Sequence, residues 1–263
     1  MRNRGRGFFL VAALAVTVSA AAQESVPAPG SDKAREILDH TIQAMGGENF
    51  LQVRDITRRG RIYTFNRGEL ANPGTKFVDY VKFPGREWFE LGNKGRIVYL
   101  NNQEQGWELD RQGIREMAPE SIKRFSENNR RDLDYLLRFA YPRGELQLYY
   151  LGREFVDNRQ VHVVEMVYED NTSVTLVVDA RSYLPMRLRY RLRDEFTGDW
   201  IEIVDTFGKY ITVRGVRTPM QFTRERNGLR TMEVHLKKVE YNTGVADDFF
   251  TLTSLEARWK KVK

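Results

Sequence analysis

Residues 185–193, with the sequence PMRLRYRLR, place an arginine at every second position of a strand-like segment. Successive side chains of a β-strand point to opposite faces, so one face of this segment is basic and the other is apolar. Guanidinium groups in such a row could bind phosphates or an acidic partner. The basic face is therefore our candidate polar contact face, made of Arg187, Arg189, Arg191 and Arg193.

The segment that follows offers a less specific explanation of this face. Residues 191–203 (RLRDEFTGDWIEI) are typical of a β-hairpin, and pairing Asp194 with Asp199 sets its register. A shift by one residue would place arginines against isoleucines, so this register is favoured. It predicts a solvated outer face, although binding to lipid head groups or an acidic partner stays open. The predicted pairs are Tyr190 with Ile203, Arg191 with Glu202, Leu192 with Ile201, and Arg193 with Trp200.

Catalytic and metal-binding patterns are absent from the sequence. His162 and Glu165 point to opposite faces of a strand, whereas Glu233 and His235 share a face but are too few for a metal site. The sequence contains no cysteine and no nucleophile-elbow, metalloprotease, phosphate-loop or dinucleotide motif. We therefore predict a binding protein and not an enzyme, with no cofactor, no metal and no nucleic-acid partner.

The N-terminus has the features of a secretory signal peptide. A basic start precedes the eleven apolar residues FFLVAALAVTV, and an Ala-x-Ala cleavage site follows at residues 20–22. We predict a signal peptide over residues 1–22, a linker over 23–31, and a periplasmic protein without a cysteine-linked lipid anchor. The net charge of the chain is +6. The leader contributes three arginines and the C-terminal RWKKVK four cations, so the rest of the chain is nearly neutral.

The pattern of apolar residues predicts helices that are segregated from a long antiparallel sheet. One helix begins at Ser31 and ends at Gly46-Gly47, where its apolar stripe stops. Five or six short strands follow, then a helical insert over residues 118–140, then about seven more strands. This order predicts an α+β fold or a strongly curved half-barrel of about 11–13 strands. Residues 32–255 form one domain, and residues 256–263 form a basic C-terminal tail.

One face of these strands is rich in large apolar side chains. It forms either a closed core or the lining of an open cavity for an acyl chain, and spacing alone does not separate the two. The candidate lining residues are Trp88, Trp107, Met166, Tyr168, Met186, Leu188 and Tyr190. The candidate lid, within the insert, comprises Ile122, Phe125, Leu133, Leu136 and Leu137.

Two long segments, residues 176–192 (LVVDARSYLPMRLRYRL) and residues 215–255, resemble the C-terminal half of bacterial outer-membrane lipoprotein-sorting proteins of the LolA/LolB-like superfamily. The matching marks are Asp179 with Leu184-Pro185, Gly215 with Pro219, and the closing YN…DDFFTL. The N-terminal helix, Trp107 after a hairpin and the helical insert also suit that family. The resemblance implies a half-open antiparallel barrel whose helices cover a hydrophobic cavity.

Members of that superfamily carry lipoprotein acyl chains across the periplasm, and relatives bind or sense other lipids. The resemblance thus implies a monomeric periplasmic protein that binds lipid or lipoprotein acyl chains, in outer-membrane lipoprotein sorting. The alternative is an envelope protein-interaction or sensor module with the same fold. It would use the arginine face and the basic tail to contact an envelope protein or an anionic membrane surface.

Overall fold

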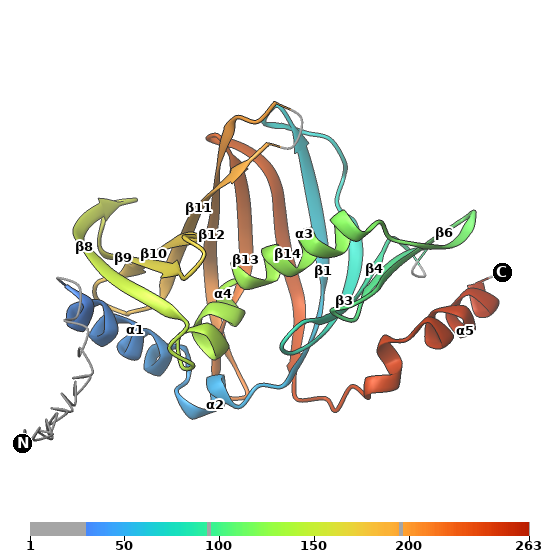
Figure 1. Cartoon of the computed structure of the whole chain (residues 1–263), viewed down its shortest axis with the longest axis horizontal. Helices are drawn as coiled ribbons and strands as arrows, with labels where there is room; N and C mark the ends of the chain where they lie inside the picture. The colour runs from blue at the N-terminus through green and yellow to red at the C-terminus, as the bar shows by residue number, and fades with distance from the viewer. Residues whose placement is uncertain (1–29, 94–95, 195–196, 263) are drawn as a thin grey trace, which may run out of the picture.

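The fold is built on one curved antiparallel sheet, seen in a computed structural model that describes residues 30–93, 96–194 and 197–262 (Figure 1). The predicted signal peptide and most of the linker lie outside these residues. The strands are β1 (Asp55–Asn66), β2 (Glu69–Leu70), β3 (Thr75–Lys82), β4 (Arg86–Leu91), β5 (Ile97–Asn101), β6 (Gly106–Asp110), β7 (Gly113–Glu116), β8 (Leu146–Val156), β9 (Arg159–Tyr168), β10 (Ser173–Asp179), β11 (Pro185–Arg193), β12 (Trp200–Val213), β13 (Val216–Arg226) and β14 (Leu229–Tyr241).

The strand order is β7-β6-β5-β4-β3-β1-β14-β13-β12-β11-β10-β9-β8, with β2 paired to β1. Strands β3 to β7 pair in chain order, and so do β8 to β14, while β1 lies between β3 and β14 and joins these two halves. The outer sides of β7 and β8 have no partner strand among the described residues, so the sheet is open. The predicted α+β fold with a curved antiparallel sheet is confirmed.

Helix α1 (Ser31–Met45) packs on the face of the sheet that carries Leu188 and Tyr190, which we call the inner face. Its apolar stripe has the 3.6-residue spacing of an amphipathic helix and is buried. The helix ends at Gly46, where φ is 130° and an added Cβ would lie 2.4 Å from the Gly215 carbonyl oxygen. The short helix α2 (Glu48–Leu51) follows and buries Phe50 in the same core.

The helical insert has two parts that pack differently. Helix α3 (Pro119–Arg130) crosses the inner face of the sheet (Figure 1), and each of its residues keeps part of its surface exposed. The next turns, α4 (Leu133–Tyr135) and η1 (Leu136–Ala140), instead join the core with α1. Among the candidate lid residues, Ile122 and Phe125 are half-buried on α3, whereas Leu133, Leu136 and Leu137 are buried.

The C-terminal residues form a helix, and not the basic tail that the sequence predicted. After η2 (Asp247–Phe250), helix α5 (Leu252–Val262) lies against the opposite, outer face of the sheet (Figure 1). Its Leu255 and the preceding Phe250 are buried with Trp88 and Trp107. The prediction of a tail overlooked this apolar stripe of α5, and it was made from the charges alone.

The predicted pairing and register of the hairpin over residues 191–203 are confirmed, while residues 195 and 196 of its tip lie outside the described residues. In β11 and β12, Tyr190 pairs with Ile203 and Leu192 with Ile201, while Arg191 pairs with Glu202 and Arg193 with Trp200. The amide of Asp194 donates to the carbonyl oxygen of Asp199 at 2.8 Å, as the turn requires. Burying Tyr190, Ile201 and Ile203 on the inner face fixes the register.

Candidate functional site

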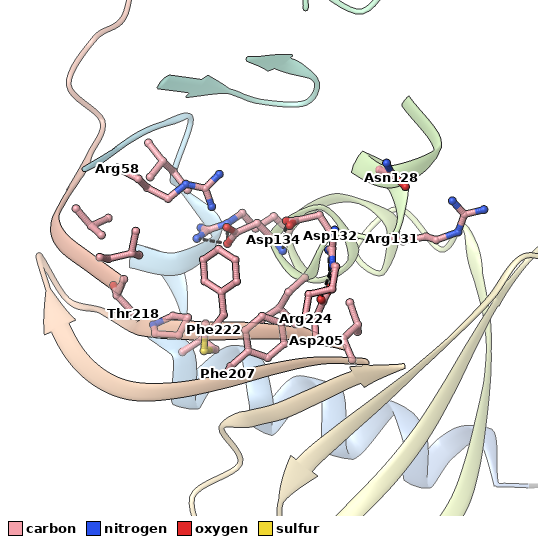
Figure 2. Close-up of a pocket in the computed structure, with 18 of the residues that line it drawn as sticks. Arg58, Asn128, Arg131, Asp132, Asp134, Asp205, Phe207, Thr218, Phe222 and Arg224 are labelled. Atoms are coloured by element: carbon pink, nitrogen blue, oxygen red, sulfur yellow. Dashed lines mark hydrogen bonds and ion pairs between the residues drawn. The ribbon is translucent and has the colours of Figure 1, made fainter. Parts of the chain in front are cut away.

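A cavity of about 110 Å³ lies between the inner face of the sheet and the helical insert (Figure 2). We call it the inner cavity. Its apolar floor comes from strands β11–β14, and its roof is formed by the last turn of α3, the two residues after it and α4. The floor side chains include Leu188, Tyr190, Phe207, Phe222 and Leu236, and the roof includes Asn128, Arg131, Asp132 and Leu133.

The sequence-derived lining residues divide among three places. Leu188 and Tyr190 line the inner cavity, whereas Met166 and Tyr168 are buried in the inner-face core beside it. Trp88 and Trp107 do not line this cavity, because they lie on the outer face beneath η2 and α5. Alternation had placed both tryptophans on an apolar face, but it could not distinguish the two faces of a sheet that are each covered by helices.

Met186 also lies on the outer face, packed against Val161, Val163 and Val177. A β-bulge between Val177 and Val178 makes Met186 an extra residue of β11, since Arg187 pairs with Val177 and Pro185 with Val178. The bulge reverses the alternation at this one position. The prediction that Met186 shares a face with Leu188 is therefore wrong.

Ion pairs cross the inner face within and beside this cavity, which strand patterning did not predict. Arg224 of β13 donates two 2.7 Å hydrogen bonds to the Asp205 carboxylate of β12. Arg58 of β1 donates through Nε to Asp79 of β3 at 2.8 Å. Figure 2 shows Arg58, Asp205 and Arg224 around the cavity with Asp132 and Asp134 of the insert. The site is therefore amphipathic, because the aromatic side chains of the cavity floor lie between the Arg58–Asp79 and Arg224–Asp205 ion pairs.

A signal for these charges was present in the sequence. Asp205 follows Ile201 and Ile203 at alternate positions of β12, and so occupies the apolar face. Arg58 likewise stands at the alternate position after Ile56. A charged residue in an apolar register is costly unless it is paired. Such a break in pattern marks an internal ion pair or a functional site.

Burial raises the pKa of two carboxyl groups on the inner face. Burial, together with the negative charge of Asp79, raises the pKa of Glu87 to about 8. Burial and the adjacent Asp134 raise the pKa of Asp132 to about 6. At neutral pH Glu87 therefore holds its proton. Burial also raises the pKa of Asp79, while its pairing with Arg58 opposes this shift.

Polar contacts at one end attach α3 to the sheet. Arg130 pairs with Asp170 at 2.7 Å, and its guanidinium carbon lies 4.2 Å from the centre of the Tyr168 ring. The Tyr168 hydroxyl donates to the Arg130 carbonyl oxygen at 2.7 Å, and the Asn129 amide donates to the Pro84 carbonyl oxygen at 2.7 Å. The C-terminal end of α3 is thus fixed by hydrogen bonds, while the rest of the helix covers the sheet without being buried.

The candidate polar contact face of β11 is largely neutralised within the molecule. Arg187 pairs with Asp157 at 2.9 Å and Arg189 with Glu154 at 3.5 Å. The Arg193 guanidinium stacks 4.2 Å from the centre of the Trp200 ring. Arg191 is exposed and stands opposite Glu202 on β12. Most of this row therefore already has partners on neighbouring strands.

The histidines contact aromatic or acidic neighbours. His162 is buried beside Tyr150, whose hydroxyl lies 3.0 Å from Nδ1, and burial lowers the pKa of His162. His40 stacks with Tyr183, and His235 contacts Glu233. Within the described ranges, no group of three or more histidine, aspartate or glutamate side chains could hold a metal ion. In the same residues, no helix has the length and hydropathy needed to span a bilayer.

Comparison with solved structures identifies the fold. A DUF1329 family protein from Desulfovibrio piger aligns with a TM-score of 0.60 and 16% identity, over 84% of this chain and 98% of that one. An outer membrane lipoprotein-sorting protein domain from Vibrio parahaemolyticus aligns with a TM-score of 0.57 and 12% identity, over 86% and 100% of the two chains. The chain has a LolA-like fold.

A LolA superfamily protein from Nitrosomonas europaea supports this assignment, with a TM-score of 0.54 and 12% identity over 84% of this chain and 98% of that one. The resemblance drawn from residues 176–192 and 215–255 is therefore confirmed at the level of fold. No sequence-family model and no curated protein sequence matches the chain. At these identities the LolA-like fold is shared, while the ligand has to be argued from the inner cavity.

Proposed function

We propose that this LolA-like protein binds lipid or lipoprotein acyl chains in the inner cavity, without covalent chemistry, as a periplasmic carrier or sensor. The position of α3 is the observation that carries the proposal. This helix roofs an apolar floor, yet each of its residues remains partly exposed. It can therefore move away from the sheet without unpacking the core formed by α1, α4 and η1.

The size of the inner cavity makes such a movement necessary. Pockets that enclose small-molecule ligands usually measure about 300–1,000 Å³. The 110 Å³ beneath α3 is too small for an acyl chain, although Phe207, Phe222 and Leu236 on its floor are only partly buried. Each methylene group buried against such side chains contributes ~0.8 kcal/mol. Displacement of α3 would extend this apolar floor and so favour entry of a chain.

Arg58 gives the inner cavity a polar end. Its Nε donates to Asp79, and its side chain, 25% exposed, lines the cavity. A guanidinium carries five N–H donors, so those that do not bond Asp79 can bind a ligand oxygen. We propose that Arg58 binds the carbonyl or head-group oxygens of the ligand, with the acyl chain lying over Phe222.

Displacement of a fluorescent fatty acid by a palmitoylated peptide tests this function. Phe222→Glu places a charge on the cavity floor and should weaken binding of both probes at least tenfold. Phe155→Glu is the matched control, because Phe155 is 78% exposed on the edge strand β8. Equal binding by wild type and both variants, or no binding by wild type, would overturn the proposal.

A further inference from the structure

A second basic surface, distinct from the arginine row of β11, lies on the outer face of β14, β1 and β3. Arg59, Arg61, Lys76, Lys237 and Lys238 are all exposed there. All of them except Lys238 line a groove of about 930 Å³, together with Tyr63 and His235. These strands are neighbours in the middle of the sheet (Figure 1), so the cations form a compact group.

Like charges stand directly opposite one another in this basic surface. Arg61 pairs with Lys76 on β3, and Arg59 pairs with Lys238 on β14. Side chains at such positions are only ~5 Å apart at Cβ, and like charges there are destabilising. The arrangement therefore opposes folding unless an anion neutralises it.

A β-bulge in β14 adds to the charge density. Lys238 pairs with Arg59, but Gly60 pairs with Leu236, so Lys237 is an extra residue in the strand. The bulge allows two consecutive lysines to be exposed on the same side, where regular alternation would have turned one of them inward.

Nearby carboxylates only partly offset these cations, since Lys238 and the charge of Arg59 lower the pKa of Glu240. Across the part of the chain that the structure describes, Arg59, Arg61, Lys76 and Lys237 form no ion pair. Glu90 is bound by Trp88 and Arg258, and Glu233 is bound by Gln221, Arg230 and His235. Lys238 is the exception, since it pairs with Glu240 at 2.8 Å. The basic surface therefore differs from the β11 row, where Arg187 and Arg189 have acidic partners.

We propose that this basic surface docks the protein on an anionic phospholipid bilayer. The strands are hydrogen-bonded on both sides, so an extended acidic peptide could not add to them as a further strand. Its carboxylates would gain only exposed ion pairs, which are weak. A bilayer offers many phosphates to all of these cations at once. Leu70, 58% exposed on β2 beside the end of β1, adds an apolar contact.

Co-sedimentation with vesicles tests the proposal. Wild type should bind vesicles of one part phosphatidylglycerol to three parts phosphatidylcholine, and much less to phosphatidylcholine alone. Binding should weaken as ionic strength rises from about 0.01 to 0.15 M, where the Debye length falls from about 30 to 8 Å. Each lost cation should lower partitioning roughly fivefold, so Arg61→Gln with Lys76→Gln should lower it ~25-fold.

Arg187→Gln with Arg191→Gln on β11 is the matched control, because it removes the same charge elsewhere. Both double variants should melt no lower than a few degrees below wild type, since Arg61 and Lys76 repel each other. Equal loss of binding in the two double variants would show that net charge, and not this surface, drives the interaction. Binding to polyglutamate without binding to the vesicles would also overturn the proposal.

Discussion

Replacing Leu188 by alanine distinguishes the core of the inner face from the part that can open. Leu188 is 1% exposed and lies on β11 between Leu176 and Asp205 at the edge of the inner cavity. The substitution removes three carbon atoms, which at ~0.8 kcal/mol each is ~2.4 kcal/mol of lost transfer free energy. The void would join the existing cavity and not collapse, so we expect a total loss near the middle of the ~2–5 kcal/mol range.

Leu192→Ala is the matched control for this prediction. Leu192 is on the same strand and the same face but only half-buried, so its loss should cost ~1 kcal/mol. Equilibrium unfolding in urea, with the slope unchanged among variants, measures both values. For a domain of this size the Leu188 variant should also melt roughly 7–14 °C lower. A cost below ~1 kcal/mol, or equal costs at the two positions, would refute the assignment of Leu188 to a rigid core.

Three further predictions concern charges. Between pH 4.5 and about 8 the folded protein keeps the Glu87 proton, whereas the unfolded chain has lost it, so the free energy of unfolding should fall as pH rises through this window. Thermal melts of Glu87→Gln should show a flatter dependence on pH. Asp205→Asn should cost ~1–2 kcal/mol in urea unfolding, because Arg224 would lose its anionic partner, and a neutral effect would contradict the importance of this pair. The Arg130 hydrogen bond lowers the pKa of Asp170 to about 2, so the hydrogen-exchange protection of the α3 amides should weaken as pH falls from about 4 to 2. In Asp170→Asn the protection should be weaker at every pH. Unchanged protection would exclude the Arg130–Asp170 pair as the contact that holds α3 on the sheet.

Periodicity predicted those parts of the fold in which each strand has one apolar and one polar face. The hairpin of β11 and β12 is the best example, since its register follows from placing Tyr190 opposite Ile203 and arginines opposite polar or aromatic residues. The end of α1 at Gly46 was predicted for a similarly local reason. Both features depend on neighbours in the chain, which the sequence displays directly.

Features that depend on distant contacts were not predicted. The bulge opposite Val177 moved Met186 to the outer face, and helix α5 covered Trp88 and Trp107 there. The ion pairs of the inner face join adjacent strands, with partners 21 and 19 residues apart, and in the sequence each gave only the isolated signal of a charge in an apolar register. The basic surface was hidden because it joins β1 to β14, which are paired in the sheet but lie far apart in the chain.

Native mass spectrometry of the protein purified from the periplasm, followed by extraction and lipid analysis, tests the central claim most directly. We expect a co-purifying acylated species in wild type and in Phe155→Glu, and its loss in Phe222→Glu. A mass that corresponds to the protein alone, unchanged after incubation with lipids and an acylated peptide, would contradict acyl-chain binding in the inner cavity.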